Sequence, residues 1–214
     1  MIKAISLLLA LAGFVTAAQA QDAAAGQTKA AMCIGCHGIP GYQATFPQVH
    51  KVPMIAGQGA GYITAALTAY ASGERKHPTM RGIAATLSEK DMADLAAFYE
   101  QQGKGQKAAP AEAAATPPAQ VAELLTKGAC ASCHGANFNK PVAPNYPKLA
   151  GQYGDYLLVA LKSYQHGDSA LAGRGNAIMA GQVKQFSAAE LKQLANYLAS
   201  LPGELQTVPQ SRFR

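Results

Sequence analysis

The sequence contains 214 residues, of which 49% are hydrophobic, and it carries a formal net charge of +6. This length allows one domain of ordinary size or two small ones. The positive charges form no basic cluster, so they give little support to nucleic-acid binding, and we expect no nucleic-acid partner.

The first twenty residues have the pattern of a secretory signal peptide. Lys3 gives a positive start, residues 5–15 form an apolar run, and Ala-Gln-Ala at residues 18–20 is a small-residue cleavage site. The apolar run is short for a membrane span, although an uncleaved anchor remains the alternative. We therefore expect residues 1–20 to be removed and the rest of the chain to lie in a bacterial periplasm without a transmembrane span. Peripheral association with the membrane stays open.

A short motif, C-x-x-C-H, occurs twice and uses every cysteine of the chain. Its members are Cys33, Cys36 and His37 in the first copy and Cys130, Cys133 and His134 in the second. This motif is the attachment signature of c-type haem. Two thiols at this spacing can form thioethers with the two vinyl groups of a porphyrin, and the histidine that follows can bind the iron. The sequence therefore predicts two covalently bound haem c groups, each with a histidine as one axial ligand.

Other readings of the four cysteines are open at this point. They could form two disulfides, two thioredoxin-like redox pairs, or together a zinc site. None of these requires a histidine directly after each second cysteine, so haem attachment is the favoured interpretation. Two haems would also cancel most of the positive net charge, because together they carry four negatively charged propionates.

The second half of the chain repeats the first, with insertions only between the matching blocks. We expect two domains at residues 21–102 and 120–204. Residues 103–119 are rich in Gly, Ala, Pro and Gln and are expected to form a linker. Residues 205–214 show no periodicity and are expected to be a solvated tail.

Each repeat has the pattern of a small all-α fold. A first helix is expected within residues 22–32, with residues 120–127 as its counterpart. A middle helix carries apolar residues at i, i+4 spacing and ends at a glycine, Gly73 in the first repeat and Gly167 in the second. The last helix begins with a serine that is followed three residues later by an acid, which is the pattern of a capping box. We interpret the apolar stripes as core packing around a haem.

The second axial ligand separates electron carriers from enzymes, because an enzyme needs an open or displaceable site on the iron. Of the methionines, only Met80 and Met179 match one another in the repeat, each in a loop after the middle helix. A lone methionine is usually core filler, but a matched pair favours distal ligands. His77 is the alternative ligand for the first iron. His50, His77 and His166 have no counterparts and are expected at the surface or in loops.

Two arginines also match in the repeat. Arg75 and Arg174 each lie five residues before the matched methionine. A guanidinium at this place could pair with a haem propionate, and the alternative is that both arginines are solvent-exposed.

With these features the chain resembles the dihaem cytochromes c4, which consist of two class I cytochrome c domains. The resemblance rests on the two C-x-x-C-H-G runs, the segments V-P-M-I-A-G-Q and Y-P-K-L-A-G-Q, and the run S-G-E-R-K-H-P-T-M-R-G-I-A-A-T-L-S. It implies that the carbonyls of Pro53 and Pro147 accept a hydrogen bond from the proximal histidines. It also implies a small residue where the first and last helices cross, which Gly26 satisfies and Glu123 does not.

Histidine and methionine together leave no iron position for a substrate, so the sequence predicts an electron carrier and not an enzyme. The resemblance implies a quinol-oxidising complex or a dehydrogenase as electron donor and a terminal oxidase as acceptor. One alternative is a dihaem electron-transfer subunit of a periplasmic dehydrogenase complex. Another is a dihaem peroxidase-type enzyme, against which the matched methionines argue.

Overall fold

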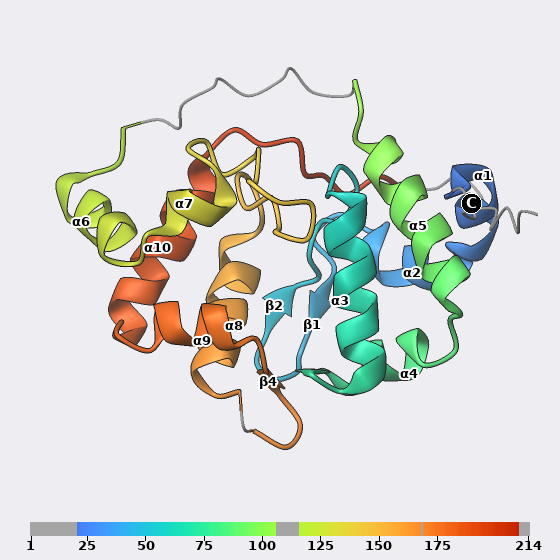
Figure 1. The fold of residues 1–214 in the computed structure, drawn as a ribbon, viewed down its shortest axis with the longest axis horizontal. Coiled ribbons are helices and arrows are strands. Elements are labelled where there is room, and N and C mark those ends of the chain that lie inside the picture. Colours follow the sequence, from blue (N-terminus) through green and yellow to red (C-terminus); the bar gives the residue numbers. More distant parts are fainter. Residues whose placement is uncertain (1–20, 106–115, 168, 210–214) are drawn as a thin grey trace, which may run out of the picture.

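The computed structural model describes residues 21–105, 116–167 and 169–209, so the signal peptide expected at residues 1–20 lies outside the described chain. The two halves of the sequence form two mostly helical units that lie side by side, the first coloured blue to green and the second yellow to red (Figure 1). The predicted all-α class is confirmed. The strands of the described chain are each two residues long and serve to pair loops.

The first unit contains five helices among the described residues. They are α1 (Ala23–Lys29), α2 (Ala31–His37), α3 (Ala60–Ser72), α4 (Pro78–Ala84) and α5 (Glu89–Gln102). The single helix expected within residues 22–32 is interrupted at Ala30, after which α2 carries the first C-x-x-C-H motif. The helix α3 ends at Gly73 in the left-handed region, as predicted, because glycine adopts a positive φ without steric cost.

The long loop after the first motif folds back on itself. Its two short strands, β1 (Gln43–Ala44) and β2 (His50–Lys51), pair in antiparallel fashion.

The second unit repeats this order of helices. They are α6 (Ala119–Lys127), α7 (Cys130–His134), α8 (Gly154–Gln165), α9 (Ala177–Val183) and α10 (Ala188–Ser200). Both predicted capping boxes are confirmed, at Ser88 for α5 and at Ser187 for α10. The expected end of α8 at Gly167 is wrong by one residue, because the helix ends at Gln165 and His166 caps it in a conformation that is not left-handed.

The first and last helices cross differently in the two units. In the first unit α1 lies so close to α5 that a Cβ placed on Gly26 would be 2.1 Å from the carbonyl oxygen of Asp94, which confirms the need for glycine at this position. In the second unit Glu123 is exposed, and α6 buries Val121 and Leu124 in the core instead. The close crossing is therefore a feature of the first unit.

The two units are joined by backbone pairing between equivalent segments. The strand β3 (Arg75–Lys76) of the first unit pairs antiparallel with β4 (Gly173–Arg174) of the second, so that Arg75 lies opposite Arg174. In addition, the backbone N–H of Lys51 donates to the Asp155 carboxylate at 3.1 Å. The strand pairing and this hydrogen bond hold the two units against each other.

The expectation of a solvated tail at residues 205–214 is wrong for its first part. Leu205 is fully buried, and the backbone N–H of Gln206 donates to the carbonyl oxygen of Ala56 in the first unit at 3.1 Å. Residues 210–214 lie outside the described chain. The chain thus returns from the second unit to the first after α10, which a search for periodicity cannot reveal.

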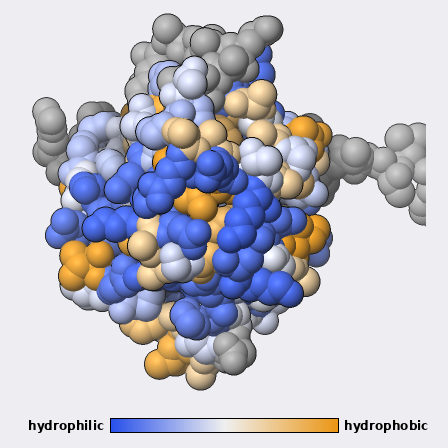
Figure 2. Space-filling model, turned by 90° about the vertical axis from the view of Figure 1, so that its left-hand side faces the viewer, coloured by the Kyte–Doolittle hydropathy of each residue, from blue (hydrophilic) through white to orange (hydrophobic). Residues whose placement is uncertain are grey.

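No helix within the described ranges is long and apolar enough to cross a membrane. Figure 2 shows the side of the molecule on which α6 lies; its surface is mostly hydrophilic, with hydrophobic residues in separate small patches.

Candidate haem-binding sites

All four cysteines are free thiols in the structure, so the disulfide reading finds no support. The described residues also contain no cluster of three or more histidine, cysteine or acidic side chains that could hold a metal ion, which argues against a zinc site. Burial raises the pKa of Cys33 and of Cys130. A thioredoxin-like pair needs a thiolate with a lowered pKa, so the redox-pair reading is disfavoured as well.

The two motifs open into one continuous cavity of about 690 Å³ that extends across the boundary between the units. Its wall includes all the predicted attachment and axial residues. They are Cys33, Cys36, His37 and Met80 from the first unit, and Cys130, Cys133, His134 and Met179 from the second. Apolar side chains from the middle and last helices form much of the remaining wall, among them Leu67, Leu95, Leu157 and Leu194. The cavity is therefore suited to large apolar rings attached at two places.

The histidines of the two C-x-x-C-H motifs are oriented by backbone carbonyls. His37 Nδ1 lies 2.8 Å from the carbonyl oxygen of Pro53, and His134 Nδ1 lies 3.0 Å from that of Pro147. Because a carbonyl only accepts, each Nδ1 carries the proton and donates, which leaves Nε2 with a free lone pair. Burial lowers the pKa of both imidazoles and so favours this neutral form. The hydrogen bonds expected between these histidines and the carbonyls of the two prolines are confirmed.

The matched methionines lie on short helices and not in loops, which corrects the expected local structure. Met80 is in the first turn of α4, and Met179 occupies the same place in α9. The backbone N–H of Met80 donates to Nδ1 of His77, and that of Met179 donates to the side chain of Asn176. The N-caps thus fix the backbone of each methionine at the cavity wall.

The three remaining histidines differ in their surroundings. His166 is exposed, as expected. His77 is the N-cap of α4, so its Nδ1 is engaged by the backbone. His50 is not a surface residue: it is buried in β2, donates from Nδ1 to the carbonyl of Gln48 at 2.8 Å, and lies against the ring of Tyr156 in the other unit. The contact with the second unit, which the sequence does not display, explains its burial.

Arg75 and Arg174 meet at the boundary of the units, where Arg75 is buried and Arg174 is half-buried, so the alternative that both are solvent-exposed is wrong. Arg75 Nη2 donates to the hydroxyl of Tyr156 at 2.8 Å, and Arg174 Nη2 donates to the same hydroxyl at 3.2 Å. Burial opposes ionisation of Tyr156, but the two guanidinium groups outweigh it and lower its pKa to about 7. Arg75 Nη1 also donates to Tyr62 at 3.3 Å. This shared tyrosine was not predicted from the sequence.

These two guanidinium groups, of which that of Arg75 is buried, provide a test of whether the residues fit a haem. No carboxylate of the described chain forms an ion pair with either arginine. The Nε of Arg75 is buried without a hydrogen-bond partner in the described chain. Arg75 lines the cavity. A buried cation and an orphaned donor fit a ligand that carries carboxylates, so the propionates of a haem match this wall.

Comparison with known proteins places the chain among the cytochromes. The cytochrome c family matches it twice, over residues 23–103 and 118–202, which is one match for each unit. Cytochrome c4 of Azotobacter vinelandii is 31% identical over 92% of this chain and 97% of its own length. The crystal structure of reduced recombinant cytochrome c4 from Pseudomonas stutzeri superimposes with a TM-score of 0.64 at 26% identity, over 86% of this chain and all of that one.

The chain belongs to the cytochrome c4 family of dihaem electron-transfer proteins. It is also 32% identical, over 85% of its length, to a protein of Stutzerimonas stutzeri strain A1501 named thiosulfate dehydrogenase electron acceptor, of which it covers 84%. The resemblance drawn from the motifs is thereby confirmed. Two cytochrome c domains that each contain a C-x-x-C pair imply two haem c groups.

Proposed function

We propose that the protein is a periplasmic carrier that passes single electrons between redox proteins through two haem c groups. In this proposal Cys33 and Cys36 attach the first haem, and Cys130 and Cys133 attach the second. The observation that carries it is the repeated set of groups on the cavity wall: each unit brings a C-x-x-C-H segment and a methionine-bearing short helix to the same space.

We assign His37 and Met80 to the first iron, and His134 and Met179 to the second. A haem ligated in this way supplies one-electron chemistry with both axial positions filled, and the thioether favours the ferrous state. The chain contributes a neutral imidazole held by a carbonyl, a capped helix that holds the methionine, and an apolar wall that excludes water. Because none of these groups has to move when the charge of the iron changes, electron transfer needs little rearrangement.

We propose residues 21–102 and 120–204 as the two haem domains, joined by a linker at residues 103–119. The family matches over 23–103 and 118–202 support these limits, as do the end of α5 at Gln102 and the start of α6 at Ala119. The structure of the leader lies outside the described residues. The assignment to the periplasm is supported by the leader pattern and by the export that attachment of haem c requires.

For partners, we propose a quinol-oxidising complex or a dehydrogenase as donor and a terminal oxidase as acceptor. A second candidate is the role of electron acceptor for a thiosulfate-oxidising dehydrogenase, which is supported by the name of one relative. The two can be separated by mixing the oxidised holo-protein with each donor and following haem reduction. Rapid reduction by thiosulfate dehydrogenase, with none by the quinol-oxidising complex, would favour the second role. Co-purification with a catalytic chain would favour the alternative of a bound subunit.

Carbon monoxide tests the proposal that both irons are closed. With Met80 and Met179 in place, we expect the reduced holo-protein to bind carbon monoxide slowly or not at all, because each axial position is occupied. Absorbance in the Soret region after mixing measures this directly. Rapid binding at one haem would contradict the proposal and favour the peroxidase-type alternative.

A further inference from the structure

Two glutamines cross the boundary of the units and bind equivalent backbone segments. Gln152 of the second unit accepts from the N–H of Met54 at 3.0 Å, and its amide donates to the carbonyl of Met54 at 2.9 Å. Gln58 of the first unit makes the same pair of bonds with Lys148, at 2.9 Å and 3.1 Å. Both glutamine side chains are buried. Each glutamine side chain therefore forms two hydrogen bonds with the backbone of one residue in the opposite unit.

Met54 and Lys148 follow directly after the prolines whose carbonyls accept hydrogen bonds from the proximal histidines. The carbonyl of Pro53 and the N–H of Met54 belong to the same peptide group. On one side this peptide accepts from His37 Nδ1 at 2.8 Å, and on the other it donates to the Gln152 side chain at 3.0 Å. A continuous chain of hydrogen bonds thus runs from an imidazole of one unit to an amide of the other.

The mirror chain has the same order. His134 Nδ1 donates to the carbonyl of Pro147, and the N–H of Lys148 in that same peptide donates to Gln58. Hydrogen bonds in series polarise one another, so a peptide that donates through its N–H becomes a better acceptor at its carbonyl. A better acceptor strengthens the bond from the imidazole and raises the basicity of the histidine.

We propose that Gln58 and Gln152 are positioning residues that set the reduction potential of the haem in the opposite unit. The proposal rests on the function proposed above, in which His37 and His134 ligate the irons. A more basic imidazole favours the ferric state, so each glutamine lowers the potential of the haem across the boundary. The dependence is crossed: Gln152 acts on the first haem, and Gln58 acts on the second.

The crossed effect distinguishes an influence on the reduction potentials from a purely structural role, in which the glutamines only hold the two units together. Other polar contacts also join the units but touch neither proximal peptide. Gln206, for example, donates from its side chain to the carbonyl of Gly103 at 3.3 Å. It offers a control, because Gln206→Met removes a side-chain hydrogen bond across the boundary without affecting either of these peptides.

The test compares Gln152→Met, Gln58→Met and Gln206→Met in the full-length holo-protein. Methionine has a similar length but forms neither hydrogen bond. The two haems are assigned by paramagnetic NMR through their thioether cysteines and then titrated separately. We expect Gln152→Met to shift the electron-exchange equilibrium toward a reduced first haem by about threefold to tenfold, the effect of one ordinary hydrogen bond. Gln58→Met shifts it toward a reduced second haem, and Gln206→Met leaves it unchanged.

A second readout is independent of the equilibrium between the haems. The Nδ1 proton of His37 should move upfield in Gln152→Met, because its hydrogen bond is weakened, while that of His134 stays in place. If Gln152→Met does not fold, Gln152→Glu retains the acceptor for Met54 and should move the same proton downfield. Equal shifts at both haems, a shift only in the mutated unit, or a fold-intact variant with no shift would overturn the proposal. Loss of histidine–methionine spectra in the unmodified protein would instead contradict the proposed function.

Discussion

At the scale of single residues, the two haem sites differ in one cavity-lining position on the last helix. Tyr99 on α5 is buried, and its hydroxyl lies beside the Cys33 sulfur, whereas Leu198 occupies the equivalent place on α10. Burial, followed by the neighbouring Cys33, raises the pKa of Tyr99, so the phenol stays protonated. Once Cys33 is a thioether, its sulfur can only accept, and the hydroxyl is the donor.

Tyr99→Phe is therefore expected to lower the potential of the first haem and to leave the second unchanged. A hydrogen bond donated to the thioether withdraws electron density and favours the ferrous state, and phenylalanine removes it while preserving the ring. A redox titration that resolves the two haems measures the effect. An unchanged first potential, or an equal change in both, would show that the hydroxyl does not act on the first haem.

The sequence predicted the residues of the site whose chemistry depends on local spacing. Cys33, Cys36 and His37 are close in the chain, and Met80 was selected by its match to Met179 in the repeat. The tyrosine shared by Arg75 and Arg174 was not predicted, because one of the two arginines lies 81 residues from Tyr156 in sequence. A contact between two repeats leaves no periodic signal in either of them.

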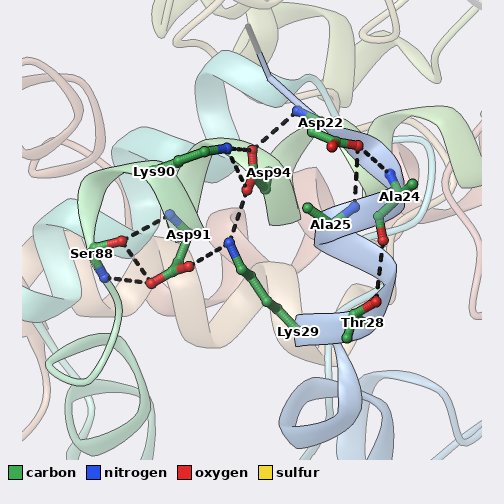
Figure 3. A network of polar contacts seen from close by, with 9 residues as sticks. All are labelled: Asp22, Ala24, Ala25, Thr28, Lys29, Ser88, Lys90, Asp91 and Asp94. Carbon is green, nitrogen blue, oxygen red and sulfur yellow. Dashed lines mark hydrogen bonds and ion pairs between the residues drawn. The ribbon is translucent and has the colours of Figure 1, made fainter. Parts of the chain in front are cut away.

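At the scale of elements, an ionic network joins the first helix of the first unit to the last (Figure 3). Asp94 on α5 is almost fully buried, and its carboxylate accepts from Lys29 Nζ at 2.9 Å, from the backbone N–H of Asp22 at 3.0 Å and from Lys90 Nζ at 3.0 Å. The bonds from Lys29, above all, hold the pKa of Asp94 well below its usual range. Lys29 and the capping Ser88 lower that of Asp91 to about 2.

This network predicts a loss of stability in acid that is larger in the first unit than in the second. A carboxylate with a lowered folded-state pKa stabilises the fold above its unfolded value of about 4. That stability falls as the pH drops from about 4 toward 2 and below. Asp94→Asn should therefore destabilise the first unit at pH 7 and flatten this dependence. Chemical denaturation followed at several pH values measures it.

The second unit provides the control for this prediction. The position equivalent to Asp94 is Gln193, which does not ionise in this range. We expect Gln193→Leu to leave the acid dependence of unfolding as it is in the unmodified protein. Acid unfolding that begins in the second unit, or persists unchanged in Asp94→Asn, would refute the role given to the network.

At the scale of the whole molecule, the two sites share one cavity and a pair of positive charges on its wall, of which one is buried and the other half-buried. Arg75 and Arg174 lie opposite one another on β3 and β4, where both units contribute. A positive charge stabilises the reduced state of a nearby haem, and burial reduces the screening of this effect. The boundary between the units is therefore expected to act on both haems at once.

Arg75→Gln is accordingly expected to lower both potentials, in contrast to the crossed effects of the glutamines. Arg81→Gln on the exposed face of α4 is the matched control and should change either potential little, because water and salt screen its charge. Potentiometric titration of both variants at low and high salt measures the two effects. A shift in only one haem would show that the guanidinium serves a single site.

The overall architecture could be predicted as two similar helical units because the repeat is visible in the sequence. Their arrangement could not, because it depends on contacts between residues that are distant in the chain. Leu205 is an example: it follows the last helix without any pattern, yet it is fully buried where the chain returns toward the first unit. No pattern in the sequence around it predicts this burial.

The most direct test of the central claim is the near-infrared band that arises from methionine–ferric haem ligation, followed during a redox titration. The unmodified holo-protein should show this band for two haems and lose it in two one-electron steps. Met80→Ala and Met179→Ala should each remove the part that belongs to one haem. A band that stays intact in either variant would contradict the account of two irons held between histidine and methionine.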